Sequence, residues 1–313
     1  MSKQYLTLHT VDAAHPSDIF ALAPRPTQLL SASGASSIKV HDTTASDFPL
    51  VQTIDSAHET GIHHLVTAKA ALRAASVGFD GGVKIWKTDS EGGEWTLEGQ
   101  VKESNKPGDV WAITLSADGN FLASSSINGK INVWSLSEAG MPKIREYETK
   151  GSFGICVNLS ADGRYTASGH QNGSIYVFDN DTGRLTHSVA GLVEPVRSVA
   201  FSPASRLLAA AGDARVIALY DVKSGEQVGN LVGHNAWIMT LDWSDTGEYL
   251  LSGSHDGKAK IWRIETRTCV ATHSHGDKPL WTAKWLPKQQ GRSEMFALAG
   301  GNKAISFYRE AAG

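Results

Sequence analysis

The chain is built from short runs in which apolar and polar residues alternate, and many of these runs end on an aromatic side chain. Residues 83–87, for example, read Val-Lys-Ile-Trp-Lys. Alternation with a period of two places successive side chains on opposite faces of an extended chain, so each run predicts a half-buried β-strand. The pattern occurs seven times, with its aromatic-column positions spaced 42 to 48 residues apart at His41, Trp86, Trp134, Phe178, Tyr220, Trp262 and Tyr308.

A turn signal precedes most of these positions. Asp or Asn stands six residues ahead of the aromatic residue in five repeats, and Gly follows it at Asp80, Asn128, Asn172 and Asp256. Asp-Gly and Asn-Gly pairs favour the two-residue loops of β-hairpins, so a hairpin is predicted before each aromatic strand. Ala35 holds this position in the first repeat, where we expect an irregular turn. Upstream of each turn lies a strand of small residues, which allows neighbouring sheets to pack closely.

Repeats of this length and pattern resemble the WD40 family over essentially the whole chain. The Gly-His pair that opens the family's repeats occurs in full as Gly233-His234. The resemblance implies an all-β, seven-bladed WD40 β-propeller. It also implies hydrogen-bonded tetrads of His, Ser, Asp and Trp, which repeats two and six carry complete, whereas repeats three, four and five lack the His. The tetrad residues are His58, Ser76, Asp80, Trp86, His234, Ser252, Asp256 and Trp262.

The N-terminal stretch is expected to close the ring. The chain ends five residues after Tyr308, so the last repeat lacks the outer strand that the other repeats take from their linkers. Residues 4–11 alternate in the manner of a strand and are predicted to complete the last blade. Closure of this kind removes exposed sheet edges. We therefore expect residues 1–313 to form a single seven-bladed propeller domain.

Composition narrows the possible partners and compartments. The 313 residues are 41% hydrophobic and 19% charged, as in ordinary globular proteins. A net charge of −3 and a pI of about 6.5 give no basic footprint, so no direct nucleic-acid partner is expected. The sequence shows neither an apolar span nor a signal-peptide core, so no membrane partner is expected and the chain is predicted to be intracellular. Cys156 and Cys269 lie in apolar runs and are expected to be buried free thiols.

The chain carries no sequence pattern of an enzyme. Neither a P-loop nor a Gly-x-Ser-x-Gly nucleophile motif occurs. The segment from His58 to His63 resembles a zinc-protease motif, but its second histidine comes one residue too late to share a helix face with the first. Most Ser, His and Asp residues hold repeat positions that the fold explains. We therefore expect no catalytic residues, no metal site and no cofactor.

The flanks of the innermost strands indicate a binding face. In propellers these strands begin beside the tight hairpin turns, on one rim of the central channel, and here the flanking positions are rich in aromatic residues. Exposed apolar patches mark interaction sites, and Trp and Arg dominate binding hot spots. Alternatively, some of these side chains plug the channel or pack between blades. The predicted partner-binding residues are Phe20, Phe79, Trp111, Phe153, Arg197, Trp237, Met239 and Trp281.

Within the WD40 family, the chain resembles the WD40 subunits of superkiller (Ski) complexes. The resemblance rests on the start Met-Ser-Lys, on residues 14–20 (Ala-His-x-x-Asp-Ile-Phe) and on the ending at 305–313. It implies a non-catalytic scaffold that joins a tetratricopeptide scaffold protein and an RNA helicase in the cytoplasm, and assists exosome-mediated 3′–5′ mRNA decay. It also implies a nuclear role with a meiotic recombination protein. The alternative is an adaptor of a ubiquitin ligase or of a chromatin or transcription complex.

Overall fold

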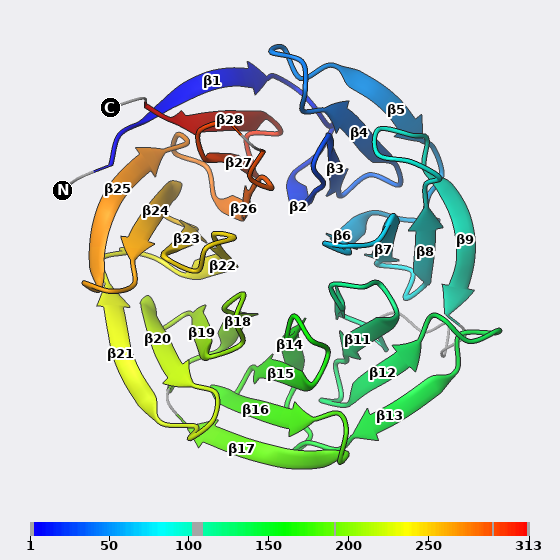
Figure 1. Cartoon of the computed structure of the whole chain (residues 1–313), viewed down its shortest axis with the longest axis vertical. Coiled ribbons are helices and arrows are strands. Elements are labelled where there is room, and N and C mark those ends of the chain that lie inside the picture. The colour runs from blue at the N-terminus through cyan, green and yellow to red at the C-terminus, as the bar shows by residue number, and fades with distance from the viewer. Residues whose placement is uncertain (1–2, 102–108, 191, 290, 312–313) are drawn as a thin grey trace.

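The computed structural model describes residues 3–101, 109–190, 192–289 and 291–311. The regular secondary structure in these ranges consists of β-strands only, and the strands form seven four-stranded antiparallel sheets. The sheets stand as blades around a central axis (Figure 1). The predicted all-β, seven-bladed propeller is therefore confirmed. The chain ends used above, 1–2 and 312–313, lie outside the described residues. No helix long and apolar enough to cross a membrane occurs in the described ranges.

The blades follow one another along the chain, each with its first strand at the channel. Blade 1 holds β2 (Ile19–Pro24), β3 (Gln28–Ser33), β4 (Ile38–Asp42) and β5 (Leu50–Ile54), and blade 2 holds β6 (Ile62–Thr67), β7 (Arg73–Gly78), β8 (Val83–Lys87) and β9 (Thr96–Val101). Blade 3 holds β10 (Ala112–Leu115), β11 (Phe121–Ser125), β12 (Ile131–Ser135) and β13 (Lys143–Tyr147), and blade 4 holds β14 (Gly154–Leu159), β15 (Tyr165–His170), β16 (Ser174–Asp179) and β17 (Arg184–Ala190). Blade 5 holds β18 (Val196–Phe201), β19 (Leu207–Gly212), β20 (Val216–Asp221) and β21 (Gln227–Val232), and blade 6 holds β22 (Ile238–Trp243), β23 (Tyr249–Ser254), β24 (Lys258–Arg263) and β25 (Thr268–Ser274). Blade 7 holds β26 (Leu280–Trp285), β27 (Met295–Gly300), β28 (Ile305–Glu310) and β1 (Tyr5–Val11).

The N-terminal strand closes the ring, as predicted. β1 pairs antiparallel with β28, from Tyr5 opposite Glu310 to Val11 opposite Ile305. The start of β1 and the end of β28 consequently lie side by side in blade 7 (Figure 1). Lys3 anchors the start of β1, because its Nζ lies 3.2 Å from Glu294 Oε2 and 2.9 Å from Glu310 Oε1.

The hydrophobic core lies between the blades. Among the described residues, buried apolar side chains form seven clusters, each shared by two neighbouring blades. The cluster that joins blade 7 to blade 1 packs Ile305 and Phe307 of β28 against Ile19 and Leu22 of β2. Small residues on the second strand of each blade allow this close packing, as in β19, where residues 209–211 are all fully buried Ala.

The hairpin turns differ in type from the predicted two-residue loop. In blade 2 the Gly81 N–H donates to the Gly78 carbonyl at 3.0 Å, and Gly81 has φ 81° while Asp80 keeps a negative φ. This is the arrangement of a type I turn followed by a glycine in the left-handed region, which forms a bulge. The same bond and a positive φ recur at Gly129, Gly173 and Gly257. In blade 1 no residue between β3 and β4 has a positive φ, so that turn differs from the others, as expected.

One of the two cysteines predicted to be buried is exposed. Cys269 is exposed, because it lies on β25, the outermost strand of blade 6, where one face of the sheet meets solvent. Cys156 is buried on β14, and burial raises the pKa of its thiol to about 12. The innermost strand of blade 3 begins at Ala112.

Candidate functional site

The two tetrads that the sequence indicates are assembled in the structure. In blade 2, His58 Nε2 lies 2.8 Å from Ser76 Oγ, His58 Nδ1 lies 3.2 Å from Asp80 Oδ1, and Trp86 Nε1 donates to Ser76 Oγ at 2.8 Å. Because the Asp80 carboxylate can only accept, Nδ1 carries the imidazole proton and Nε2 accepts from the serine hydroxyl. Ser76 in turn accepts from Trp86, so each buried polar group of the relay has a partner.

Blade 6 repeats this network. His234 Nε2 lies 2.7 Å from Ser252 Oγ, and Trp262 Nε1 donates to the same oxygen at 2.8 Å. His234 Nδ1 lies 3.2 Å from Asp256 Oδ2. Burial opposes ionisation of Asp256, but hydrogen bonds from His234 and from the backbone of Asn235 outweigh it and hold the carboxyl pKa well below its usual range.

These networks have the connectivity of a catalytic Ser–His–Asp triad but not its accessibility. Ser76 and Ser252 both have 0% exposure, and a Trp N–H occupies each hydroxyl oxygen. A nucleophile must reach a substrate carbonyl, which a wholly buried hydroxyl cannot do. The chemistry of the tetrads is therefore that of a hydrogen-bonded clamp between strands.

Blade 4 contains a related network that the sequence pattern did not reveal. This blade lacks the opening His, but His170 at the end of β15 places Nε2 2.9 Å from Ser168 Oγ. His170 Nδ1 donates to the Ser152 carbonyl at 2.8 Å. The imidazole thus reaches the serine from the hairpin side of the same strand. A His two residues after the repeat's Ser, at 168 and 170, is the sequence signal for it.

A bulge at the start of six of the seven innermost strands turns one side chain toward the central channel. In six blades the register with the second strand shifts directly after the first residue, as between Ile238 and Thr240. In blade 3, Trp111 holds the equivalent place and its N–H donates to the Ser125 carbonyl at 2.7 Å. β-Bulges commonly re-aim side chains beside functional sites. The residues skipped by the ladder in the other six blades are Phe20, His63, Ile155, Arg197, Met239 and Trp281.

The aromatic rim, as we name the eight predicted partner-binding residues, forms a nearly continuous ring of contacts. Phe79 comes from a hairpin turn, and Phe153 and Trp237 from the residues just before β14 and β22. Ring centroids are 5.1 Å apart for Phe153 and Trp111, 6.5 Å for Trp111 and Phe79, 6.1 Å for Phe79 and Phe20, and 5.8 Å for Phe20 and Trp281. The rim thereby joins side chains of blades 4, 3, 2, 1 and 7.

Two histidines that were not among the predicted binding residues complete this arc. His63 lies between Phe79 and Trp111, with its ring centroid 4.7 Å and 4.8 Å from theirs. His255 joins Trp281 to Trp237, at centroid distances of 5.9 Å and 5.6 Å. The sequence held a signal for His255, because it precedes the turn Asp of blade 6 as Phe79 precedes that of blade 2.

Polar groups hold several rim side chains in place. Arg197 bridges to Asp213, with Nη2 3.0 Å from Oδ2, and its guanidinium lies 4.6 Å from the Trp237 ring. Trp281 Nε1 donates to Asp18 Oδ2 at 3.0 Å. Phe79 and Trp237 remain 42% and 45% exposed, so large apolar surfaces face solvent beside oriented polar groups.

The rim surrounds the opening of a central cavity of about 730 Å³. Inner strands of all seven blades line it, and six of the eight rim residues lie at its wall. Phe153 and Trp237 flank the opening instead. The rim side chains therefore frame the channel and leave its interior open. His63 contributes a neutral imidazole to this wall, because burial lowers its pKa to about 4. The described residues contain no group of three or more His, Cys, Asp or Glu arranged to hold a metal ion.

Comparisons with known proteins agree with this architecture. The WD40 family, described as WD domain, G-beta repeat, matches residues 95–135, 183–221 and 225–263. Each match runs from the outermost strand of one blade to the third strand of the next, the same stagger by which β1 closes blade 7.

Relatives match over most of the chain. It is 41% identical to meiotic recombination protein rec14 of Schizosaccharomyces pombe, over 100% of this chain and 99% of that protein. It is 25% identical to antiviral protein SKI8 of Saccharomyces cerevisiae, over 87% of this chain and 83% of that protein. Striatin-4 of Mus musculus is 27% identical over 51% of this chain but only 22% of its own length. Together with the seven blades, these matches show that the chain belongs to the WD40-repeat family, in the group that includes rec14 and SKI8.

Proposed function

We propose that this chain is a non-catalytic scaffold subunit that docks short segments of partner proteins on the aromatic rim. The observation that carries the proposal is the rim itself, where ring contacts and the Arg197–Trp237 stack link all the blades but leave half-exposed apolar faces at Phe79 and Trp237. Oriented aromatic and Arg side chains with little freedom left to lose are well suited to act as hot spots.

The relatives suggest which complexes the scaffold serves. Similarity to SKI8 supports a place in a Ski-type complex, beside a tetratricopeptide scaffold protein and an RNA helicase, that assists exosome-mediated 3′–5′ mRNA decay in the cytoplasm. Similarity to rec14 along the whole chain supports a second role with a meiotic recombination protein in the nucleus. A single rim can serve both roles if the partners present similar segments.

Two further observations favour scaffolding over chemistry or nucleic-acid binding. The triad-like serines are inaccessible, and the net charge of −3 offers no footprint for a phosphate backbone. RNA contact in such a complex would then fall to the helicase.

Affinity purification of the tagged chain tests the assignment. Recovery of a helicase together with a tetratricopeptide protein is the expected result, with a recombination protein added in meiotic cells. Recovery of a cullin or of histone-modifying subunits in their place would overturn it and favour the adaptor alternative.

Rim variants test the binding face. Trp111→Ala and Trp281→Ala should each weaken partner binding about 30-fold, as expected for a hot spot worth about 2 kcal/mol. Trp237→Ala, at an exposed position, should weaken binding without loss of stability. Leu185→Ala, on the half-exposed outer strand of blade 4, is the matched control and should bind normally. Normal binding by all three rim variants would rule out this face.

A further inference from the structure

Beneath the rim, one layer of the cavity wall consists mostly of small side chains. In six blades the next channel-facing position, two residues after the start of the innermost strand, also lines the cavity. These residues are Ala21, His64, Cys156, Ser198, Thr240 and Thr282. His64 is the one large side chain among them, so it stands in open space rather than in a packed layer. The volume of about 730 Å³ lies within the range of small-molecule sites.

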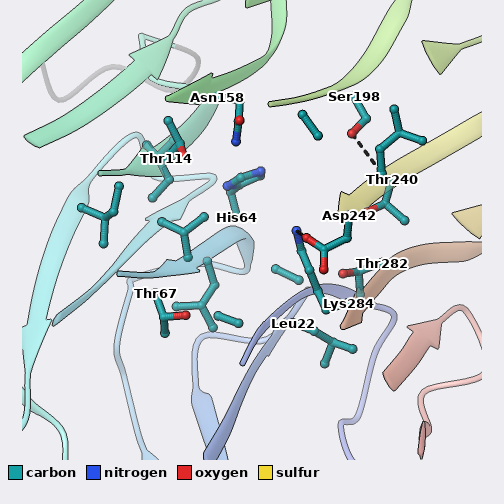
Figure 2. Close-up of a pocket in the computed structure, with 18 of the residues that line it drawn as sticks. Leu22, His64, Thr67, Thr114, Asn158, Ser198, Thr240, Asp242, Thr282 and Lys284 are labelled. Carbon is teal, nitrogen blue, oxygen red and sulfur yellow. Dashed lines mark hydrogen bonds and ion pairs between the residues drawn. The ribbon is translucent and has the colours of Figure 1, made fainter. Parts of the chain in front are cut away.

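Three polar side chains from different blades converge in this cavity. Figure 2 shows His64 of β6, Asn158 of β14 and Lys284 of β26 pointing into it. Asn158 Oδ1 accepts from the Phe201 N–H at 3.0 Å, which leaves the NH₂ group of Asn158 for the cavity. Lys284 Nζ donates to Asp242 Oδ1 at 3.0 Å and keeps two further protons.

Where these three side chains converge, hydrogen-bond donors outnumber acceptors. Asp242 is occupied twice, because its Oδ2 also accepts from the Trp285 N–H at 2.8 Å. His64 Nδ1 is buried and has no hydrogen-bond partner. Burial, with smaller effects of His63 and then of Lys284, lowers the pKa of His64 to about 3, so its ring is neutral and carries one N–H. Buried polar atoms without partners are rare in folded proteins and call for a ligand or ordered water.

We propose that the cavity beneath the aromatic rim is a binding site for a small oxyanion, a carboxylate or a phosphate, held by Lys284, His64 and Asn158. Such a group accepts hydrogen bonds from all three residues, and the bond from the lysine is charge-assisted. Asp242 partly neutralises Lys284, so the site suits a singly charged oxyanion. The oxyanion is either a free small molecule or the carboxylate of an acidic side chain that enters from a partner segment on the rim.

Titration of the whole chain, followed by NMR of the histidine ring signals, tests this proposal. The probes are acetate, inorganic phosphate, N-acetyl-glutamate amide and, as its uncharged match, N-acetyl-glutamine amide. Saturable shifts of the His64 signals with acetate or phosphate are expected for a free anion. Stronger binding of the glutamate derivative than of acetate, with none by the glutamine derivative, is expected for a partner's side chain.

Variants separate this site from unspecific binding. Lys284→Met should weaken binding at least ~10-fold, the loss expected for one hydrogen bond to a charged group. Lys223→Met, in the exposed turn after β20, is the matched control and should bind as the unmodified chain does. Asn158→Ser tests the site with a smaller change if Lys284→Met does not fold. The proposal is overturned if no probe shifts the His64 signals, or if every variant binds like the control.

Discussion

The hydroxyl of Ser252 lies at the centre of the blade 6 tetrad, where it both donates and accepts a hydrogen bond. Ser252→Ala removes only this hydroxyl. In the native protein that oxygen accepts from Trp262 Nε1 at 2.8 Å and lies 2.7 Å from His234 Nε2. The residue has 0% exposure, so water cannot replace the lost group. The substitution adds no atoms and introduces no steric clash.

The expected loss follows from the two groups left without a partner. A buried polar group deprived of its hydrogen bond costs about 1–3 kcal/mol, so Ser252→Ala should lower the free energy of unfolding by about 2–6 kcal/mol. This is a large share of the ~5–15 kcal/mol of a typical domain. It should exceed the effect of most surface substitutions, which stay within about 0.5 kcal/mol.

Urea unfolding followed by tryptophan fluorescence measures this loss. The midpoint should fall while the slope with urea stays unchanged, because the surface exposed on unfolding is the same. Ser188→Ala, exposed on β17, is the matched control. The double variant with Trp262→Phe should lose less free energy of unfolding than the sum of the two single losses, because both substitutions break the same network. A loss no larger than that of Ser188→Ala would refute the clamp.

Three further predictions use other buried groups. Tyr220→Phe should raise the free energy of unfolding by about 1 kcal/mol in the same urea assay, because the buried Tyr220 hydroxyl has no partner; a clear loss would show that it has one. Deletion of residues 1–11 should lower the thermal midpoint, because it removes the burial of Tyr5, worth about 2 kcal/mol. It should also promote association, because it exposes the edge of β28. If the deletion variant melted like the full chain, closure by β1 would be contradicted. Acid should destabilise the fold below about pH 6.5, because the histidines of the unfolded chain become protonated there whereas the buried histidines of the folded chain stay neutral. Their folded pKa values, about 3 for His15 and His64 and about 4 for His41 and His63, mean that each lowers the free energy of unfolding by up to ~1.4 kcal/mol per pH unit as the pH falls toward 4. A flat stability profile from pH 6.5 to 4.5 would count against neutral burial.

Features that depend on neighbouring residues could be predicted from the sequence alone. The number of blades follows from seven aromatic positions at regular spacing, because each blade is a local unit whose strands alternate in sequence as they do in space. The positions of the complete tetrads and of the closing strand follow from the same repeat. The aromatic positions of the rim could also be found, since they recur beside the start of each innermost strand.

Features that depend on where strands end up needed the tertiary structure. Cys269 resembles a core residue in sequence, but its place on an outermost strand exposes it. His170 replaces the missing tetrad histidine from within its own strand, and although it follows the repeat's Ser by two residues, only the structure shows that its ring turns back to Ser168. The strand-start bulges alter which side chains meet the channel, and alternation alone does not encode them.

The cavity is the clearest case of this second kind. His64, Asn158 and Lys284 belong to blades 2, 4 and 7 and are more than ninety residues apart in sequence, and nothing in the local pattern of any one of them indicates a shared site. Ring closure alone brings their strands around one axis (Figure 1). The sequence by itself therefore determined the blades, because blade formation is local, whereas only the closed ring decided which polar groups face one another, because that depends on contacts between distant blades.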